Sequence, residues 1–132
     1  DACLQHRVPL VYGAVERFTG QVSVFDAGRQ RGQAPCSRSL SPDPPPPEFA
    51  PNCSEAGVLG VLPGMVGLLQ ATEVLKLLLG IGEPLVGRLL SFDALGMRFR
   101  ETRLRPDPAC PLCAPGKAFP GYIDYAAFCS GP

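Results

Sequence analysis

The 132-residue sequence lacks an excess of charge of either sign. Lysine and arginine together number 12, aspartate and glutamate also number 12, and the formal net charge is zero. This balance disfavours a nucleic-acid binder that works through a basic surface. The sequence also lacks the phosphate-binding patterns GxGxxG and GxxxxGK[ST], so it predicts no nucleotide cradle. With one histidine, His6, and no GxSxG pattern, it indicates no Ser-His-Asp triad.

A targeting segment is lacking too. The first ten residues, DACLQHRVPL, contain no long apolar stretch, and we expect a cytoplasmic protein. The chain opens with Asp1 rather than methionine, and residues 1–7 resemble the end of a helix that runs into a strand, so we expect further sequence upstream. Without a secretory signal, a disulfide-stapled secreted domain is the weakest hypothesis for the six cysteines.

Proline and glycine, in contrast, are abundant, at 16 and 15 residues, and predict a loop-rich chain. Residues 27–51 contain the run Pro44–Pro47, which favours an extended polyproline conformation. By composition alone this segment is more typical of a mobile surface linker than of a loop that crosses over a site. Loops of this length in compact domains are usually functional or disordered, which keeps the second interpretation open.

Four short segments rich in β-branched and aromatic residues predict two antiparallel hairpins. The first pairs residues 10–16 with 20–26, and the second pairs 87–94 with 97–104. In the first hairpin, Val22 and Val24 are expected to share one face. Three arginines of the second hairpin, at positions 98, 100 and 103, favour a solvated strand face over a binding patch.

Residues 58–79 predict the main helix. Their uncharged run ends at Leu69, and a polar stripe follows, which favours a long buried helix over a membrane span. Pro63 suits the first helical turn, and Gly80 suits the position just after the last turn. The stripe consists of Gln70, Glu73 and Lys76.

Small residues in the first half of this helix, Gly60, Gly64 and Gly67, would allow a second helix to approach closely. That helix could come from a second subunit. Ordinary core packing within one chain explains the same residues equally well.

Cys110-x-x-Cys113 has the spacing of a metal-binding knuckle, and Cys36-x-x-Ser39 has the same spacing upstream. Two such knuckles can hold a tetrahedral zinc ion, but serine is a poor zinc ligand because its hydroxyl is not ionised at neutral pH. The fourth ligand is left open among water, His6, Cys3 and a carboxylate. A metal-free pair of reduced loops, or an adventitious disulfide, is the competing interpretation.

Cys53 is a candidate nucleophile. Asn52 could cap a helix with Glu55 completing the capping pair, which would put Cys53 at the first helical position. Free N–H groups and the helix dipole lower a thiol pKa there. The local sequence alone nevertheless favours an ordinary half-buried cysteine.

Taken in order, several segments resemble the MoeB/ThiF/HesA family, the sulfur-carrier adenylyltransferases related to ubiquitin-activating enzymes. The combination covers nearly the whole chain, although each segment alone is a weak signal. The segments are PLVYGAV (9–15), GQVSVF (20–25), CSEAGVLG (53–60), QATEVLK (70–76), GRLLSFD (87–93), CPLC (110–113) and IDYAAFC (123–129).

The resemblance implies the C-terminal lobe of a ThiF-type Rossmann-like α/β fold, with a mixed sheet, antiparallel hairpins and one long buried helix. Residues 1–115 would form this lobe, 27–51 would be a loop crossing the carrier's tail, and 116–132 would be a tail segment. ATP and Mg²⁺ would be bound only by an N-terminal lobe absent from these residues. The intact enzyme would be a homodimer.

The activity implied by the resemblance is adenylation of the C-terminal glycine of a ubiquitin-like sulfur carrier such as MoaD, ThiS or an Urm-like protein. The pathways would be molybdopterin synthesis, thiamine synthesis or tRNA thiolation. The resemblance makes a transfer role for Cys53 as plausible as a structural one. It assigns zinc to Cys36, Cys110 and Cys113, while Ser39 departs from the family's fourth cysteine. The alternative is a non-catalytic truncated module that dimerises or binds a ubiquitin-like tail.

Overall fold

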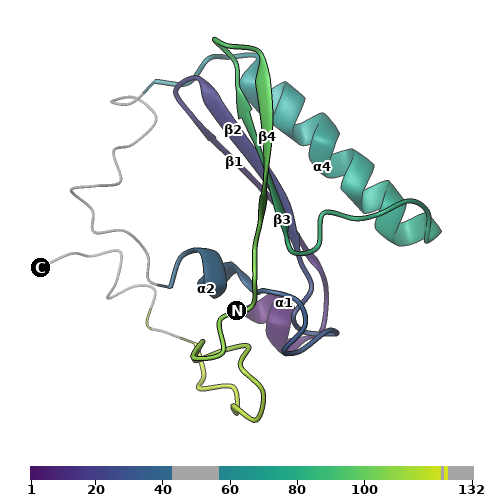
Figure 1. Ribbon diagram of the computed structural model, residues 1–132, viewed down its shortest axis with the longest axis vertical. Coiled ribbons are helices and arrows are strands. Elements are labelled where there is room, and N and C mark those ends of the chain that lie inside the picture. The colour runs from purple at the N-terminus through teal and green to yellow at the C-terminus, as the bar shows by residue number, and fades with distance from the viewer. Residues whose placement is uncertain (43–56, 123, 125–132) are drawn as a thin grey trace, which may run out of the picture.

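The computed structural model describes residues 1–42, 57–122 and 124, which form a four-stranded sheet with one long helix against it. Figure 1 shows this helix along the upper part of the sheet, and two one-turn helices with a long loop at the other end. The elements are α1 (Ala2–Gln5), β1 (Leu10–Glu16), β2 (Thr19–Phe25), α2 (Ser37–Leu40), α4 (Leu62–Leu79), β3 (Arg88–Asp93) and β4 (Arg98–Arg103).

Both predicted hairpins are confirmed to within one residue. β1 pairs with β2 around a turn at Arg17 and Phe18, and β3 pairs with β4 so that Phe92 stacks on Phe99. β2 pairs with β3 antiparallel as well. The α/β fold class is confirmed, but the expectation of a mixed sheet is corrected, because all pairing between the four strands is antiparallel.

The connection from β2 to β3 explains the antiparallel pairing. The last residues of β2 and the first residues of β3 lie at the same end of the sheet. At this end, the Val24 amide donates to the Leu85 carbonyl at 3.2 Å. The chain is next anchored at the opposite end, where the Leu59 amide donates to the Arg17 carbonyl at 2.8 Å. α4 then returns along the sheet, so β3 must run opposite to β2. Residues 43–51 of the expected crossing loop lie outside the described residues.

α4 approaches the first hairpin closely because two glycines leave room for it. A Cβ atom on Gly20 would lie 2.7 Å from a methyl carbon of Val66, and one on Gly13 would lie 2.4 Å from the Gln70 side chain. A larger residue at Gly20 would press on the branched Val66 side chain of the helix, whereas at Gly13 the flexible end of Gln70 would have to move aside. The core formed beneath the helix consists of Val22, Val24, Val66 and Leu85.

The polar stripe of α4 faces the protein. Gln70 donates from Nε2 to the Val11 carbonyl at 3.2 Å, and the buried Glu73 accepts through Oε2 from the Leu85 amide at 2.7 Å. Lys76 donates from Nζ to the Glu83 carbonyl at 2.8 Å and pairs with Glu73. These side chains satisfy backbone groups of β1 and of the segment that enters β3, so the stripe fastens the helix to the sheet.

The opposite side of α4 is apolar and exposed. Leu68 is 72% exposed and Leu78 is 77% exposed, and a third leucine, Leu75, is 56% exposed. The expectation of a buried helix is therefore corrected: α4 is covered on one side only, because one sheet face is all that packs against it in the described part of the chain. By length and composition α4 could also cross a bilayer, with a mean hydropathy of 1.4 over 18 residues.

The helix ends match the sequence prediction. Pro63 lies in the first turn of α4, where its missing N–H breaks no intrahelical hydrogen bond. Gly80 follows the last turn with φ at 63°, the left-handed region that glycine adopts without steric cost.

Replacing Glu73 by alanine should destabilise the fold by about 1–3 kcal/mol, because the Leu85 amide would be buried without an acceptor. Chemical denaturation measures this change. Glu83→Ala removes the same charged group from an exposed position nearby, and we expect it to change stability by less than about 0.5 kcal/mol. Equal effects of the two variants would contradict the anchoring role of Glu73.

Candidate metal centre

Three cysteines from two segments that are far apart in the sequence converge beyond the end of the sheet. Cys36, Cys110 and Cys113 are 4%, 1% and 1% exposed, and their Sγ atoms all lie within 4.8 Å of one another. The Sγ atoms of Cys36 and Cys110 are 3.6 Å apart. The fold thus brings together the CxxC and the upstream cysteine, as the sequence predicted, and the three could bind a metal ion.

Local backbone structure positions each thiol. Cys36 is the residue before the single turn of α2, and the Ser39 amide donates to its carbonyl at 3.0 Å. Cys110 lies in a turn that begins at Asp107, whose Oδ1 accepts from the Ala109 amide at 2.8 Å. The Cys110 amide donates to the Asp107 carbonyl at 3.1 Å. Both knuckles therefore hold their side chains through backbone hydrogen bonds.

Ser39 stands beside the three thiols. Its Oγ lies 3.5 Å from Sγ of Cys113 and 3.9 Å from Sγ of Cys36. Because it follows Cys36 by three residues across one helical turn, its side chain returns to the same side. Ser39 is half-buried, so it forms the most accessible corner of the group.

The thiols differ in their tendency to ionise. Burial, together with hydrogen bonding and repulsion from Cys113, raises the pKa of Cys36 to about 12. Burial also opposes ionisation of Cys110, but hydrogen bonds from the Cys113 and Leu112 amides outweigh it and lower the pKa of that thiol. A metal ion that bound here would have to displace the thiol protons.

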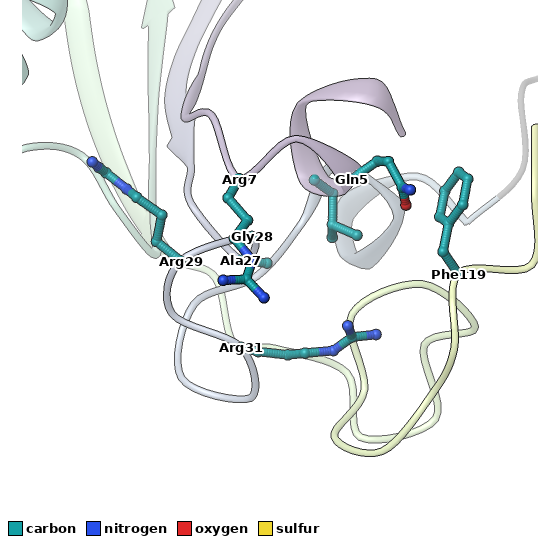
Figure 2. A pocket seen from close by; sticks show the side chains of 8 residues that line it. Gln5, Arg7, Ala27, Gly28, Arg29, Arg31 and Phe119 are labelled. Atoms are coloured by element: carbon teal, nitrogen blue, oxygen red, sulfur yellow. The ribbon is translucent and has the colours of Figure 1, made fainter.

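Arg31 clamps the CxxC loop from outside. Its Nη2 donates to the carbonyls of Leu112 at 2.7 Å and Lys117 at 2.6 Å, and its Nε donates to Ala114 at 3.3 Å. Figure 2 shows the side chain reaching across from its own loop toward the loop that carries Phe119. The clamp therefore joins the two segments that carry the candidate metal ligands.

A buried carboxylate builds the loop that presents Arg31. Asp26 is 2% exposed, and its oxygens accept from Arg29 Nε at 2.8 Å and from Gln30 Nε2 at 2.8 Å. The turn closes where the Arg29 and Gln30 amides both donate to the Asp26 carbonyl. A hollow of about 600 Å³ lies between this loop, α1 and Phe119, and Arg7 lines it together with Arg31 (Figure 2).

The remaining sequence candidates are not part of this group. Cys3 is half-buried and His6 is exposed, and neither belongs to the set of close thiols. Cys3, Cys36, Cys110 and Cys113 are free thiols. Cys53 lies outside the described residues, as does Cys129. Arg31 was missed by sequence reasoning, because GRQRGQ carries no pattern that distinguishes a clamp from a polar linker.

Comparison with known proteins agrees with this geometry. The sequence pattern of the ThiF family matches residues 1–112, which include both hairpins, α4 and two of the three clustered cysteines, Cys36 and Cys110. The chain belongs to the ThiF family.

Curated relatives are similar along almost all of the chain. The sulfur carrier protein adenylyltransferase of Thermus thermophilus is 50% identical over 130 residues, covering 98% of this chain and 48% of that protein. The SAMP-activating enzyme E1 of Haloferax volcanii is 47% identical over 116 residues, covering 88% of this chain and 41% of that protein. The chain thus spans about half the length, or less, of these relatives.

Solved structures support the fold. Escherichia coli MccB superimposes with a TM-score of 0.65 at 12% identity, over 93% of this chain and 37% of that one. At this identity the likeness shows the ThiF-type fold alone.

Arg31→Ala should expose Cys110 and Cys113 to thiol reagents in chelator-treated protein. Loss of a charge-assisted hydrogen bond costs about 1.5–3 kcal/mol, so local opening and modification should become at least about tenfold faster. Peptide mapping by mass spectrometry gives the rate for each cysteine. Arg7→Ala removes the same charge from the same hollow and keeps the three carbonyl contacts, so its rates should equal those of the unmodified protein. Unchanged rates in Arg31→Ala would show that the clamp does not hold the loop.

Proposed function

We propose that this chain is the half of a sulfur-carrier adenylyltransferase that engages the carrier protein. In the intact enzyme, a carboxylate oxygen of the carrier's C-terminal glycine would attack the α-phosphorus of Mg-ATP, releasing pyrophosphate and leaving an acyl-adenylate. The nucleotide would be held by a lobe outside these residues. The observation that carries the proposal is 50% identity to a sulfur carrier protein adenylyltransferase over 98% of the chain.

The division of labour follows from what the sequence contains. It has the sheet, the long helix and the cysteine cluster of the family, but no glycine-rich pattern that would cradle phosphates. The carrier would be ubiquitin-like and would serve molybdopterin synthesis, thiamine synthesis or tRNA thiolation. The free thiols at Cys36, Cys110 and Cys113 suit a reducing compartment such as the cytoplasm.

We further propose that the cysteine cluster binds zinc. Buried thiols are the donors that zinc prefers, and a tetrahedral site with Zn–S distances near 2.3 Å places sulfur atoms about 3.8 Å apart. The 3.6 Å between Cys36 and Cys110 fits that spacing. The ion would tie the CxxC loop to the segment after β2 and stabilise the fold; it would take no part in adenylation.

Two parts of the proposal concern residues near the carrier's tail. Residues 27–51 would cross over that tail, since the chain is anchored at opposite ends of the sheet before and after this segment. Cys53 would serve as a transfer cysteine for the activated carrier. Its position in the match to the family is the support for this role.

The exposed side of α4 supports a homodimer. Val61, Leu68, Leu75 and Leu78 are each more than half exposed, and open space lies where Cβ atoms of Gly64 and Gly67 would be. Small residues beside leucines let a second helix approach closely, and exposed apolar patches of this kind mark interaction sites. Glu73 and Lys76 pair with each other and bond to the Leu85 amide and the Glu83 carbonyl, as expected for a helix packed on protein, so we propose a second subunit as its cover, not a membrane.

A non-catalytic module that binds a ubiquitin-like tail is the second candidate, favoured by the missing phosphate-binding pattern. The two candidates differ in one respect: only the first yields carrier adenylate once a nucleotide-binding lobe is supplied.

The chain should bind a ubiquitin-like sulfur carrier that ends in Gly-Gly. The carrier from the Thermus thermophilus pathway, immobilised on a biosensor, is a practical probe. Removal of its last two glycines is the matched control and should weaken binding at least about tenfold, or about 1.4 kcal/mol. Equal binding of both forms, or no binding of either, would contradict recognition of the carrier's tail.

Leu68→Glu should convert a dimer to a monomer, because it would bury an unpaired charge in an apolar interface. Sedimentation equilibrium measures the change. Leu95→Glu is the control, since Leu95 is 72% exposed like Leu68 but lies in the turn between β3 and β4. A dimer that survives Leu68→Glu, or dissociates equally with Leu95→Glu, would show that α4 is not the interface.

A further inference from the structure

The fourth corner of the cysteine cluster is an oxygen. Ser39 Oγ lies 3.5 Å from Cys113 Sγ and 3.9 Å from Cys36 Sγ, while Cys36 and Cys110 are separated by 3.6 Å. With the three Sγ atoms all within 4.8 Å of one another, the hydroxyl oxygen and the sulfur atoms form one compact group of four. The sequence alone marked Ser39 as the position where the metal-binding pattern fails.

These separations match those of a mixed sulfur and oxygen site. With zinc about 2.3 Å from sulfur and about 2.0–2.2 Å from oxygen, a tetrahedral ion separates two sulfurs by about 3.8 Å and a sulfur from an oxygen by about 3.6 Å. The observed values differ from these by a few tenths of an ångström. Without a metal ion, the same distances correspond to weak hydrogen bonds between the Ser39 hydroxyl and the thiols of Cys36 and Cys113.

The carboxylates that could otherwise serve as a fourth ligand already have hydrogen-bond or ion-pair partners. Asp26 is saturated by Arg29 and Gln30, and Asp107 caps its own turn. Asp1 pairs with Arg38 at 2.8 Å. Among the described residues, the only histidine, cysteine or carboxylate groups within 4.8 Å of one another at this place are the three thiols. The hydroxyl of Ser39 is thus the protein atom at the open corner.

We propose that Ser39 supplies the fourth ligand through Oγ, which makes this a site of three thiolates and one hydroxyl. The inference rests on the proposal that the cluster binds zinc and is independent of carrier activation. Three thiolates around a divalent ion leave one negative charge, whereas four leave two. The neutral oxygen ligand at the half-buried corner should make the ion easier to exchange than in a site with four thiolates.

Cobalt(II) titration of the reduced full chain tests this assignment, because thiolate-to-cobalt charge-transfer absorbance increases with the number of thiolate ligands. We expect tetrahedral cobalt with three thiolates in the unmodified chain. Ser39→Cys should raise the charge-transfer absorbance by about a third, following the change from three thiolates to four, and tighten binding. Ser39→Ala should weaken binding by about tenfold, as water replaces a tethered ligand. Cys3→Ser, which removes a thiol outside the cluster, should leave both spectrum and affinity unchanged.

Three other results would each contradict a different part of the proposal. Ser39→Ala with unchanged spectrum and affinity would remove Ser39 from the coordination sphere and leave the zinc proposal intact. Cobalt uptake by Ser39→Cys but not by the unmodified chain would show that four thiolates are needed. Absence of uptake by both, with thiols confirmed free by titration, would overturn the metal site itself. None of these readouts involves the carrier or ATP, so they are separate from the test of adenylation.

Discussion

The contact between α4 and the first hairpin is the constraint on which the rest of the structure depends. Gly13 and Gly20 let the helix lie close to β1 and β2, and Glu73 fixes the segment that enters β3. The attached side of the helix also buries Leu62 and Val66, whereas Leu68, Leu75 and Leu78 lie on the opposite, exposed side. Packing the helix on one sheet face therefore produces both a two-layer unit and an exposed apolar surface on the other side of α4.

The cysteine cluster and its neighbours hold the loops together at the other end of the sheet. There the regular strands have ended, and only short turns hold the backbone between Asp26 and α2 and after β4. The buried Asp26 organises one loop, Arg31 joins that loop to the CxxC segment, and Cys36 meets Cys110 and Cys113 in a small apolar core. A metal ion would stabilise this end most, since closing loops this distant in sequence removes much conformational entropy from the unfolded chain.

Sequence periodicity predicted where the helix and strands form, but it did not predict which side of α4 is buried. Alternation of residues predicted both hairpins, and Pro63 and Gly80 predicted the ends of α4, because these are local effects. The orientation of Gln70, Glu73 and Lys76 is not local: it depends on which backbone groups of β1 and of the β3 entry lack partners. A polar stripe normally indicates the solvent side of a helix, and here it indicates the attached side.

The candidate metal site was also predictable only where its residues form a local sequence pattern. CxxC spacing identified Cys110 and Cys113 and pointed to Cys36, whereas the place of Ser39 Oγ in the group follows from the turn of α2. Arg31 was not predictable, because its three acceptors are backbone carbonyls that no side-chain pattern encodes.

In the proposed enzyme, this chain binds the carrier protein while another lobe binds the nucleotide. The decisive experiment is ATP–pyrophosphate exchange in the presence of Mg²⁺ and a carrier ending in Gly-Gly. We expect background exchange with the 132-residue chain, and carrier-dependent exchange once the nucleotide-binding lobe of a ThiF-family relative is added. Carrier-dependent exchange by the 132 residues alone would show that no second lobe is needed and would refute this division of roles.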